Sequence, residues 1–260
     1  MKGAAVQRVL PETDLEKQMM CMGAVFIEEN HVLDDLYDII GSDLQDGKEL
    51  TADAKEQVLK EMDEYFFRLD LNWGSEIRGD CIEILRDFWG VADKTTALKT
   101  LEDIRQQGHR TKFNVLKNTI PKGGLDKVSL EKFKQIFTFD FGDQQEMALQ
   151  DDEYALLATW MQKTDRFVGE CGVLGWDIGR LVHLTRLSYI AGYISDDEAW
   201  AEILKMAPIA AGKFKDWREF ALSFIIGRTF WAGEEDPEVK KVCERLLGHP
   251  ASPWLFYSLV

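Results

Sequence analysis

Three charged residues stand on a segment that otherwise has the composition of a protein interior. Asp177, Arg180 and Arg186 are the only formally charged residues in the range 177–193, and a helix drawn through this range carries apolar side chains on nearly every side. A helix that is apolar all round is an interior helix. A charge inside a protein needs a partner, because its transfer from water is costly. This segment is therefore the first place to look for chemistry.

A second segment repeats the pattern. In the range 217–231 an apolar stripe carries Arg228 in its middle and ends at Trp231. Guanidinium groups can bind carboxylates in buried ion pairs, or can receive a carboxylate or phosphate from a ligand. The candidate site residues all lie on or directly beside these two segments: Trp176, Asp177, Arg180, His183, Arg186, Arg228 and Trp231.

Two interpretations of these residues are open. In the structural interpretation, Asp177 and the three arginines form a hydrogen-bonded ion network between helices, with Glu170, Glu198 or Glu219 supplying further acids. In the functional interpretation, one acid against three bases leaves surplus positive charge for a small anionic ligand, with tryptophans stacking on a planar group. We favour the structural interpretation, because arginine's planar fork suits buried pairing.

The motifs of common enzyme classes are missing from the sequence. It contains no GxSxG elbow, no P-loop, no HExxH and no GxGxxG that opens a helix after a strand. Its four cysteines and four histidines are scattered without metal-finger spacing, so we expect reduced thiols, no metal site and no cofactor. No apolar run reaches the roughly 18 residues needed to cross a bilayer, and the N-terminus is a poor signal peptide. We expect a cytoplasmic protein, and the missing motifs favour a non-enzymatic role over catalysis.

Charge is unevenly distributed along the chain, whose formal net charge is −15. Residues 28–103 contain 21 acids and 8 bases, whereas residues 104–142 contain 8 bases and 3 acids. The acidic region repels nucleic acid and anionic membrane surfaces, and an acidic surface can attract a basic protein. We therefore expect a basic protein partner rather than nucleic acid or membrane, with the oligomeric state left open. The acids nominated as partner-binding residues are Asp34, Asp35, Asp63 and Glu64.

Helical patterns dominate the sequence from end to end. Capping boxes at Thr13–Glu16 and Ser195–Glu198 mark two helix starts, and apolar residues recur at helical spacing in most other segments. The pattern predicts an all-α fold, a compact bundle of about ten helices with no substantial sheet. We expect an acidic helical region at 1–118, a linker-like segment at 119–146 and a second helical region at 147–260, the two regions forming one compact unit.

Short motifs along the chain resemble those of a known family. They are Trp89-Gly90-Val91, Ala97-Leu98, Leu101, Gly108-His109-Arg110, Phe113, Trp176-Asp177, Gly179-Arg180, Ala191-Gly192-Tyr193, Glu198-Ala199-Trp200, Trp217, Phe220, Gly227-Arg228 and Phe230-Trp231. In their order and spacing the chain resembles the DUF1266 family, roughly from Leu85 to Gly233, although residues 114–170 show no matching motif. The resemblance implies an all-helical bacterial cytoplasmic protein and implies no reaction.

Function must then be argued from the residues. The acidic region and the missing catalytic motifs favour a non-enzymatic interaction protein that docks a basic partner, as a toxin-immunity protein or a secretion-system adaptor would. The alternative is a ligand-binding protein or enzyme that uses the Asp/Arg/Trp residues as a pocket for a small anion. The number of acids facing the three arginines discriminates between the two hypotheses.

Overall fold

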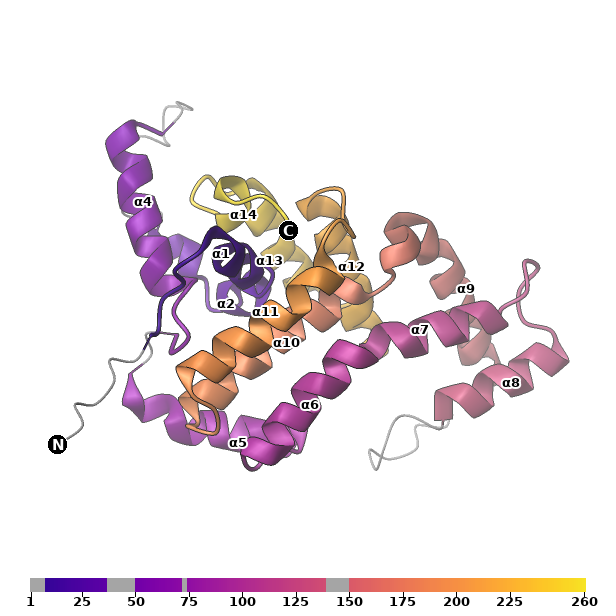
Figure 1. Ribbon diagram of the computed structural model, residues 1–260. Helices are drawn as coiled ribbons and strands as arrows, with labels where there is room; N and C mark the ends of the chain where they lie inside the picture. The colour runs from indigo at the N-terminus through magenta and orange to yellow at the C-terminus, as the bar shows by residue number, and fades with distance from the viewer. Residues whose placement is uncertain (1–7, 37–49, 72–73, 139–149) are drawn as a thin grey trace.

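The computed structural model describes residues 8–36, 50–71, 74–138 and 150–260. Helices form the regular structure of these residues and no β-strand occurs among them, which confirms the predicted all-α class. The elements follow in chain order (Figure 1): α1 (Asp14–Cys21), α2 (Ala24–Glu28), α4 (Ala52–Tyr65), η1 (Ser75–Ile77), α5 (Arg78–Trp89), α6 (Lys94–Gln106), α7 (Gly108–Thr119), α8 (Lys127–Thr138), α9 (Asp151–Val168), η2 (Gly169–Cys171), α10 (Leu174–Ile190), α11 (Asp196–Ala210), α12 (Trp217–Ala232), α13 (Pro237–Gly248) and α14 (Pro253–Phe256).

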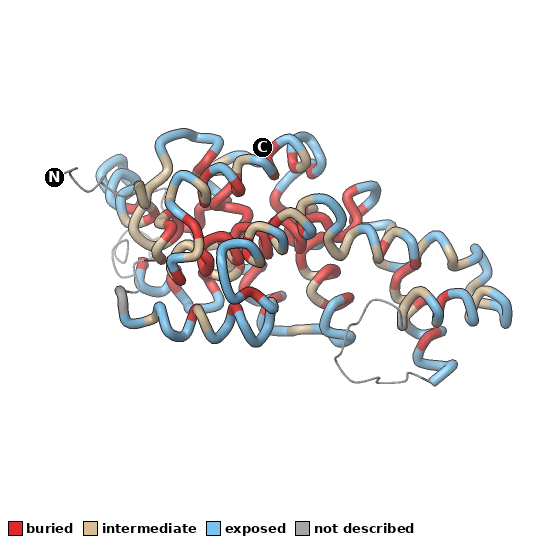
Figure 2. Tube along the Cα trace, turned by 60° about the horizontal axis from the view of Figure 1, so that its bottom comes forward, coloured by how far each residue is buried: buried red, intermediate tan, exposed pale blue. Residues whose placement is uncertain are grey.

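Helix α10 is the interior helix that its composition predicts. Of its 17 residues, 14 are buried. It packs against α5, α6, α7, α11 and α12, so neighbours surround it on all sides. In Figure 2 the buried residues gather in the middle of the molecule, and exposed residues dominate its two ends. An apolar circumference without a polar stripe has no stable place except inside such a ring of helices.

The contact between α10 and α12 depends on a glycine. A Cβ atom built on Gly227 would lie 2.3 Å from the Cβ of Trp176, closer than two carbon atoms can approach. The missing side chain therefore lets the backbone of α12 lie directly against the tryptophan of α10. This approach sets the position of Trp176, which matters for the polar cluster described below.

Side-chain caps define several helix starts, as the sequence predicts. Both capping boxes form, at Thr13 with Glu16 and at Ser195 with Glu198. Pro237 occupies the first turn of α13, where its missing N–H costs no hydrogen bond. These local signals fix where helices begin, because each cap satisfies backbone N–H groups that have no partner within the helix.

The N-terminal and C-terminal helices pack into one body. Helix α1 lies against α11, α2 against α13, and α5 to α7 against α10. The range 119–146 holds α8, whose Phe133 is fully buried and which packs on α7 and α9. Its last residues, 139–146, lie outside the described part of the chain. The predicted boundaries between the two helical regions and the linker-like segment, after residue 118 and before residue 147, stay a prediction.

Two parts of the chain extend from different ends of this body (Figure 1). Helix α4 rises from one end with only Val58 and Met62 buried, and the α8–α9 pair forms an arm at the other end.

None of the described helices is long and apolar enough to span a membrane. All four cysteines are free and buried, as expected of reduced thiols.

A buried aspartate–arginine cluster as the candidate functional site

Asp177 is the centre of the buried polar cluster. Its carboxylate is fully buried in the first turn of α10 and accepts hydrogen bonds from the backbone N–H groups of His109 (2.8 Å) and Arg110 (3.0 Å). It also accepts from the Arg110 Nη1 at 3.0 Å and from the Arg180 Nη2 at 2.8 Å. These four bonds match the roughly four lone-pair directions of a carboxylate. Asp177 therefore has no remaining capacity to act as a general base or to bind a ligand.

The backbone of α7 explains why an acid from another helix is needed here. Helix α7 begins with Gln107 as its N-cap, and that residue makes no side-chain capping bond. Asp177 takes this role from α10, where its negative charge also suits the positive end of the α7 dipole. Gly108 has φ +56°, and a Cβ atom there would lie 2.2 Å from the Asp177 Oδ2. Only glycine fits between the two helices at this point.

Arg180 is held on several sides. Its guanidinium lies 5.3 Å from the ring centroid of Trp176 and 5.8 Å from that of Trp89, in addition to its bond with Asp177. Burial lowers its pKa, although Asp177 opposes this shift. Its Nε has no hydrogen-bond partner among the described residues. Ion pairing and two aromatic rings thus replace most of the water that this cation loses.

His109 is a neutral member of the cluster. Burial, followed by the charges of Arg180 and Lys112, lowers its pKa to about 3. Its Nδ1 lies 3.0 Å from the Trp176 Nε1 and its Nε2 lies 3.3 Å from the Arg180 Nη1. A neutral imidazole has one acceptor nitrogen, so only one of these contacts can be a hydrogen bond. The shorter one, donated by Trp176, leaves the imidazole proton on Nε2.

The other two predicted arginines lie outside this cluster. Arg228 pairs with Asp236 at 3.0 Å and lies 4.8 Å from the ring centroid of Trp231. Trp231 is 46% exposed, and its ring centroid lies 5.9 Å from that of Trp176. Because Arg228 is bound by an acid of its own, the four predicted network members do not form one hydrogen-bonded network.

Within the described part of the chain, Arg186 has no carboxylate partner. It is buried, and its Nη2 donates to the Arg68 carbonyl oxygen at 2.6 Å, while its Nε and Nη1 lack partners among the described residues. Burial lowers its pKa to about 9, although Asp70 opposes the shift. His183, one turn earlier, stacks on Phe26 with ring centroids 4.4 Å apart, and burial lowers its pKa to about 3. Arg186 and His183 therefore lie in a second buried polar region of α10, apart from the Asp177 cluster.

The sequence interpretation missed the residues that complete the cluster. None of the three glutamates nominated as acid partners binds a predicted arginine: Glu198 pairs with Lys94, and Glu219 accepts from the backbone N–H of Lys215. The acid of Arg228 is Asp236 instead. His109 and Arg110 stand in the family motifs, but nothing in their local sequence shows that they contact α10. Only the packing of α7 on α10 brings them to Asp177.

The nominated partner-binding acids are mostly engaged within the molecule. Asp34 pairs with Arg245 at 2.8 Å, Asp63 with Lys17 at 3.0 Å and Glu64 with Arg68 at 3.2 Å. Asp35 is exposed and has no ion-pair partner among the described residues. Three of these four acids are thus partly neutralised before any partner arrives.

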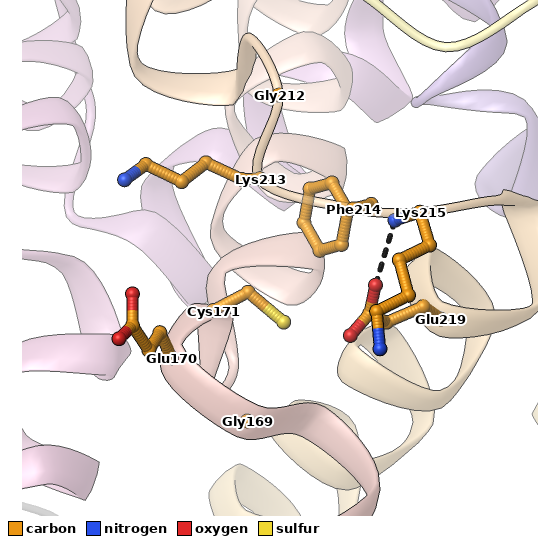
Figure 3. A pocket seen from close by; sticks show the side chains of 8 residues that line it. All are labelled: Gly169, Glu170, Cys171, Gly212, Lys213, Phe214, Lys215 and Glu219. Carbon is orange, nitrogen blue, oxygen red and sulfur yellow. Dashed lines mark hydrogen bonds between the residues drawn. The ribbon is translucent and has the colours of Figure 1, made fainter.

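A hollow of about 390 Å³ lies away from the cluster (Figure 3). The η2 segment, the loop before α12 and the start of α12 line it, and none of the three predicted arginines does so. Figure 3 shows the Cys171 sulfur pointing into it beside Phe214, with lysines and glutamates around the rim. Burial raises the pKa of the Cys171 thiol to about 11, which disfavours the reactive thiolate. The lining residues are Gly169, Glu170, Cys171, Gly212, Lys213, Phe214, Lys215 and Glu219.

Fold and cluster together define an all-helical protein whose interior helix is tied to its neighbours by a saturated carboxylate. The chain belongs to the family described as "Protein of unknown function (DUF1266)", whose model matches residues 84–258. It is 21% identical over 168 residues to "Uncharacterized protein YbeR" of Escherichia coli (strain K12). That match covers 65% of each protein, so the aligned part is less than two thirds of the relative's length. No solved structure matches the chain.

Proposed function

We propose that this protein is a non-enzymatic interaction protein that binds a basic protein through acids on its N-terminal helices. The observation that carries the proposal is a set of acids that lack ion-pair partners among the described residues. Asp35 follows α2, and the others lie on or next to α4, α5 and α6. All but the half-buried Glu61 are exposed: Asp35, Asp53, Glu56, Glu61, Glu76, Asp80, Glu83 and Asp103. Unpaired surface acids attract cations at long range and strengthen the encounter with a basic partner.

The state of the buried cluster supports the same proposal. Asp177 uses its acceptor capacity on α7 and two arginines, and His109 is neutral with its Nδ1 facing the Trp176 indole. A group that acts as an acid, base or ligand holder needs a free proton site or lone pair. The cluster is better suited to hold α7 and α10 together than to perform a reaction.

Affinity capture with a matched pair of variants tests the proposal. Glu61→Lys with Glu83→Lys reverses one acid on α4 and one on α5. Glu234→Lys with Glu235→Lys makes the same change of total charge on the exposed connection between α12 and α13. We expect proteins captured by the wild type from its own cell extract to be lost with the first variant and retained with the second. Titration of a captured partner should show at least about a tenfold weaker Kd for the first variant, and weaker binding in high salt.

The outcome that contradicts the proposal is equally plain. If both double variants retain the same proteins, or if the captured proteins are not basic, the acids of α4 and α5 are not a docking surface. Circular dichroism at matched concentration must show unchanged helicity, so that lost binding is not lost folding.

A narrower form of the proposal concerns biological context. We place this interaction in the bacterial cytoplasm, where an immunity protein or secretion adaptor meets a basic client. The neighbouring genes test this form. A co-encoded toxin or secreted basic protein is the expected result, whereas a metabolic operon would favour the alternative of a small-molecule ligand.

A further inference from the structure

Two apolar side chains of α5 are exposed beside the buried face of this helix. Phe88 is 76% exposed and Ile84 is 37% exposed. They are four positions apart, so they are neighbours along one face of the helix. Cys81 and Leu85, on the adjacent face, are buried and anchor the helix in the core. An exposed phenylalanine beside an exposed isoleucine on one helix is a small apolar patch available to a partner.

Acids border this patch. Asp80 precedes Ile84 by one helical turn, and Glu83 and Asp87 form the adjacent row at the same spacing. Asp80 and Glu83 are exposed and have no ion-pair partner among the described residues, while Asp87 is bound by its neighbour Arg86. The surface therefore combines an apolar centre with a negative margin. Its complement is an apolar side chain flanked by lysines or arginines.

The end of α5 is held in a defined position. Trp89, next to Phe88, lies against the guanidinium of Arg180 at 5.8 Å, and Gly90 ends the helix in the left-handed conformation with φ +63°. The buried cluster thus fixes the turn that presents Phe88. A preformed surface loses little conformational freedom on binding, which favours affinity.

We propose that the Ile84–Phe88 face of α5 is the docking site for a basic amphipathic helix of a partner protein. The inference rests on the proposed function and adds the site and the form of the partner. The helix would place an apolar residue on Phe88 and Ile84 and its basic residues beside Asp80 and Glu83. Helix-in-groove recognition commonly uses apolar anchors at such spacing, and aromatic anchors tend to dominate interface energies.

A designed peptide tests this site directly. The probe is a fluorescent helix of leucine and lysine, 12 residues long to match the length of α5, with leucines on one face. Anisotropy titrations compare it with a peptide of the same composition in scrambled order. We expect the amphipathic peptide to bind more tightly, and Phe88→Ser with Ile84→Ser to weaken its Kd at least tenfold.

Leu156→Ser is the control that removes an exposed apolar side chain at a different place on the molecule. Leu156 is 69% exposed on α9 and follows Asp152 by one turn, so it repeats the local chemistry at the other end of the molecule. This variant should bind the amphipathic peptide like the wild type. Equal losses in the α5 and α9 variants would show that the peptide binds any exposed apolar side chain, and equal binding of the two peptides would show that it senses net charge alone. Either result would overturn the site.

The experiment separates this inference from the proposal on which it rests. If Glu61→Lys with Glu83→Lys loses the natural partner but Phe88→Ser with Ile84→Ser retains both the partner and the peptide, the acidic docking function stands and the α5 site is wrong. If the acid reversal also leaves partner binding intact, both proposals fail.

Discussion

At the scale of single residues, the charged groups of α10 differ in what binds them. Asp177 satisfies two guanidinium groups and two backbone N–H groups, whereas Arg186 is buried without any carboxylate within ion-pairing distance among the described residues. Breaking a buried pair by removing one partner strands the other charge, which costs far more than an exposed pair contributes. The first prediction uses this difference.

We expect Asp177→Asn to lower the free energy of unfolding by about 3–5 kcal/mol, because Arg110 and Arg180 lose their common carboxylate inside the protein. Asp236→Asn is the control, since it removes the acid of the partly exposed Arg228 pair but keeps an N-cap for α13. It should cost less than about 1 kcal/mol. Urea unfolding measures both, and similar losses would show that the buried cluster is not a structural centre.

His109 gives a pH-dependent prediction. Its pKa is lowered to about 3, so above an unfolded-state pKa of about 6.5 both states are neutral and the histidine contributes no pH dependence. Between these values the unfolded state binds the proton and the native state does not, so stability falls as pH falls, by at most about 1.4 kcal/mol per pH unit.

His109→Gln cannot take up this proton and keeps an amide oxygen for Trp176. In urea titrations from about pH 7 to about pH 4, we expect the variant to lose less stability than the wild type. His183 titrates in the same window in both proteins, so it cancels from the comparison. Parallel stability curves would mean that His109 is protonated in the native state.

At the scale of elements, backbone approach decides how the helices meet. Among the described helices, α10 and α12 share the most extensive contact, and Gly227 lies against Trp176 where a methyl group has no space. The tryptophan in turn bonds His109 at the start of α7. One glycine therefore influences contacts among three helices.

Alanine substitutions test this directly. We expect Gly227→Ala to destabilise the protein by about 1–3 kcal/mol through overpacking. Gly79→Ala on α5, where nothing lies within 4 Å of the new Cβ atom, should be neutral or stabilising by up to about 1 kcal/mol. Thermal unfolding followed by circular dichroism measures the two shifts, and a stabilising Gly227→Ala would show that α10 and α12 can move apart without loss.

At the scale of the whole molecule, α4 and α5, which carry most of the proposed docking acids, lie at one end, and the α8–α9 arm extends from the other (Figure 1). The family match begins at Ile84, so it includes the second half of α5 and excludes α4. The proposed docking surface thus has one part inside the shared family region and one part particular to the chain's N-terminal segment.

The sequence by itself determined the helical class, the interior position of α10 and the capped helix starts. These depend on residues close together in the chain, through apolar periodicity and local hydrogen bonds. It did not determine which acid meets which arginine, because Asp177 reaches Arg110 across 67 positions and Asp34 reaches Arg245 across 211. Such pairings exist only after helices pack, and the same packing decided that Asp177 is saturated and Phe88 is left uncovered.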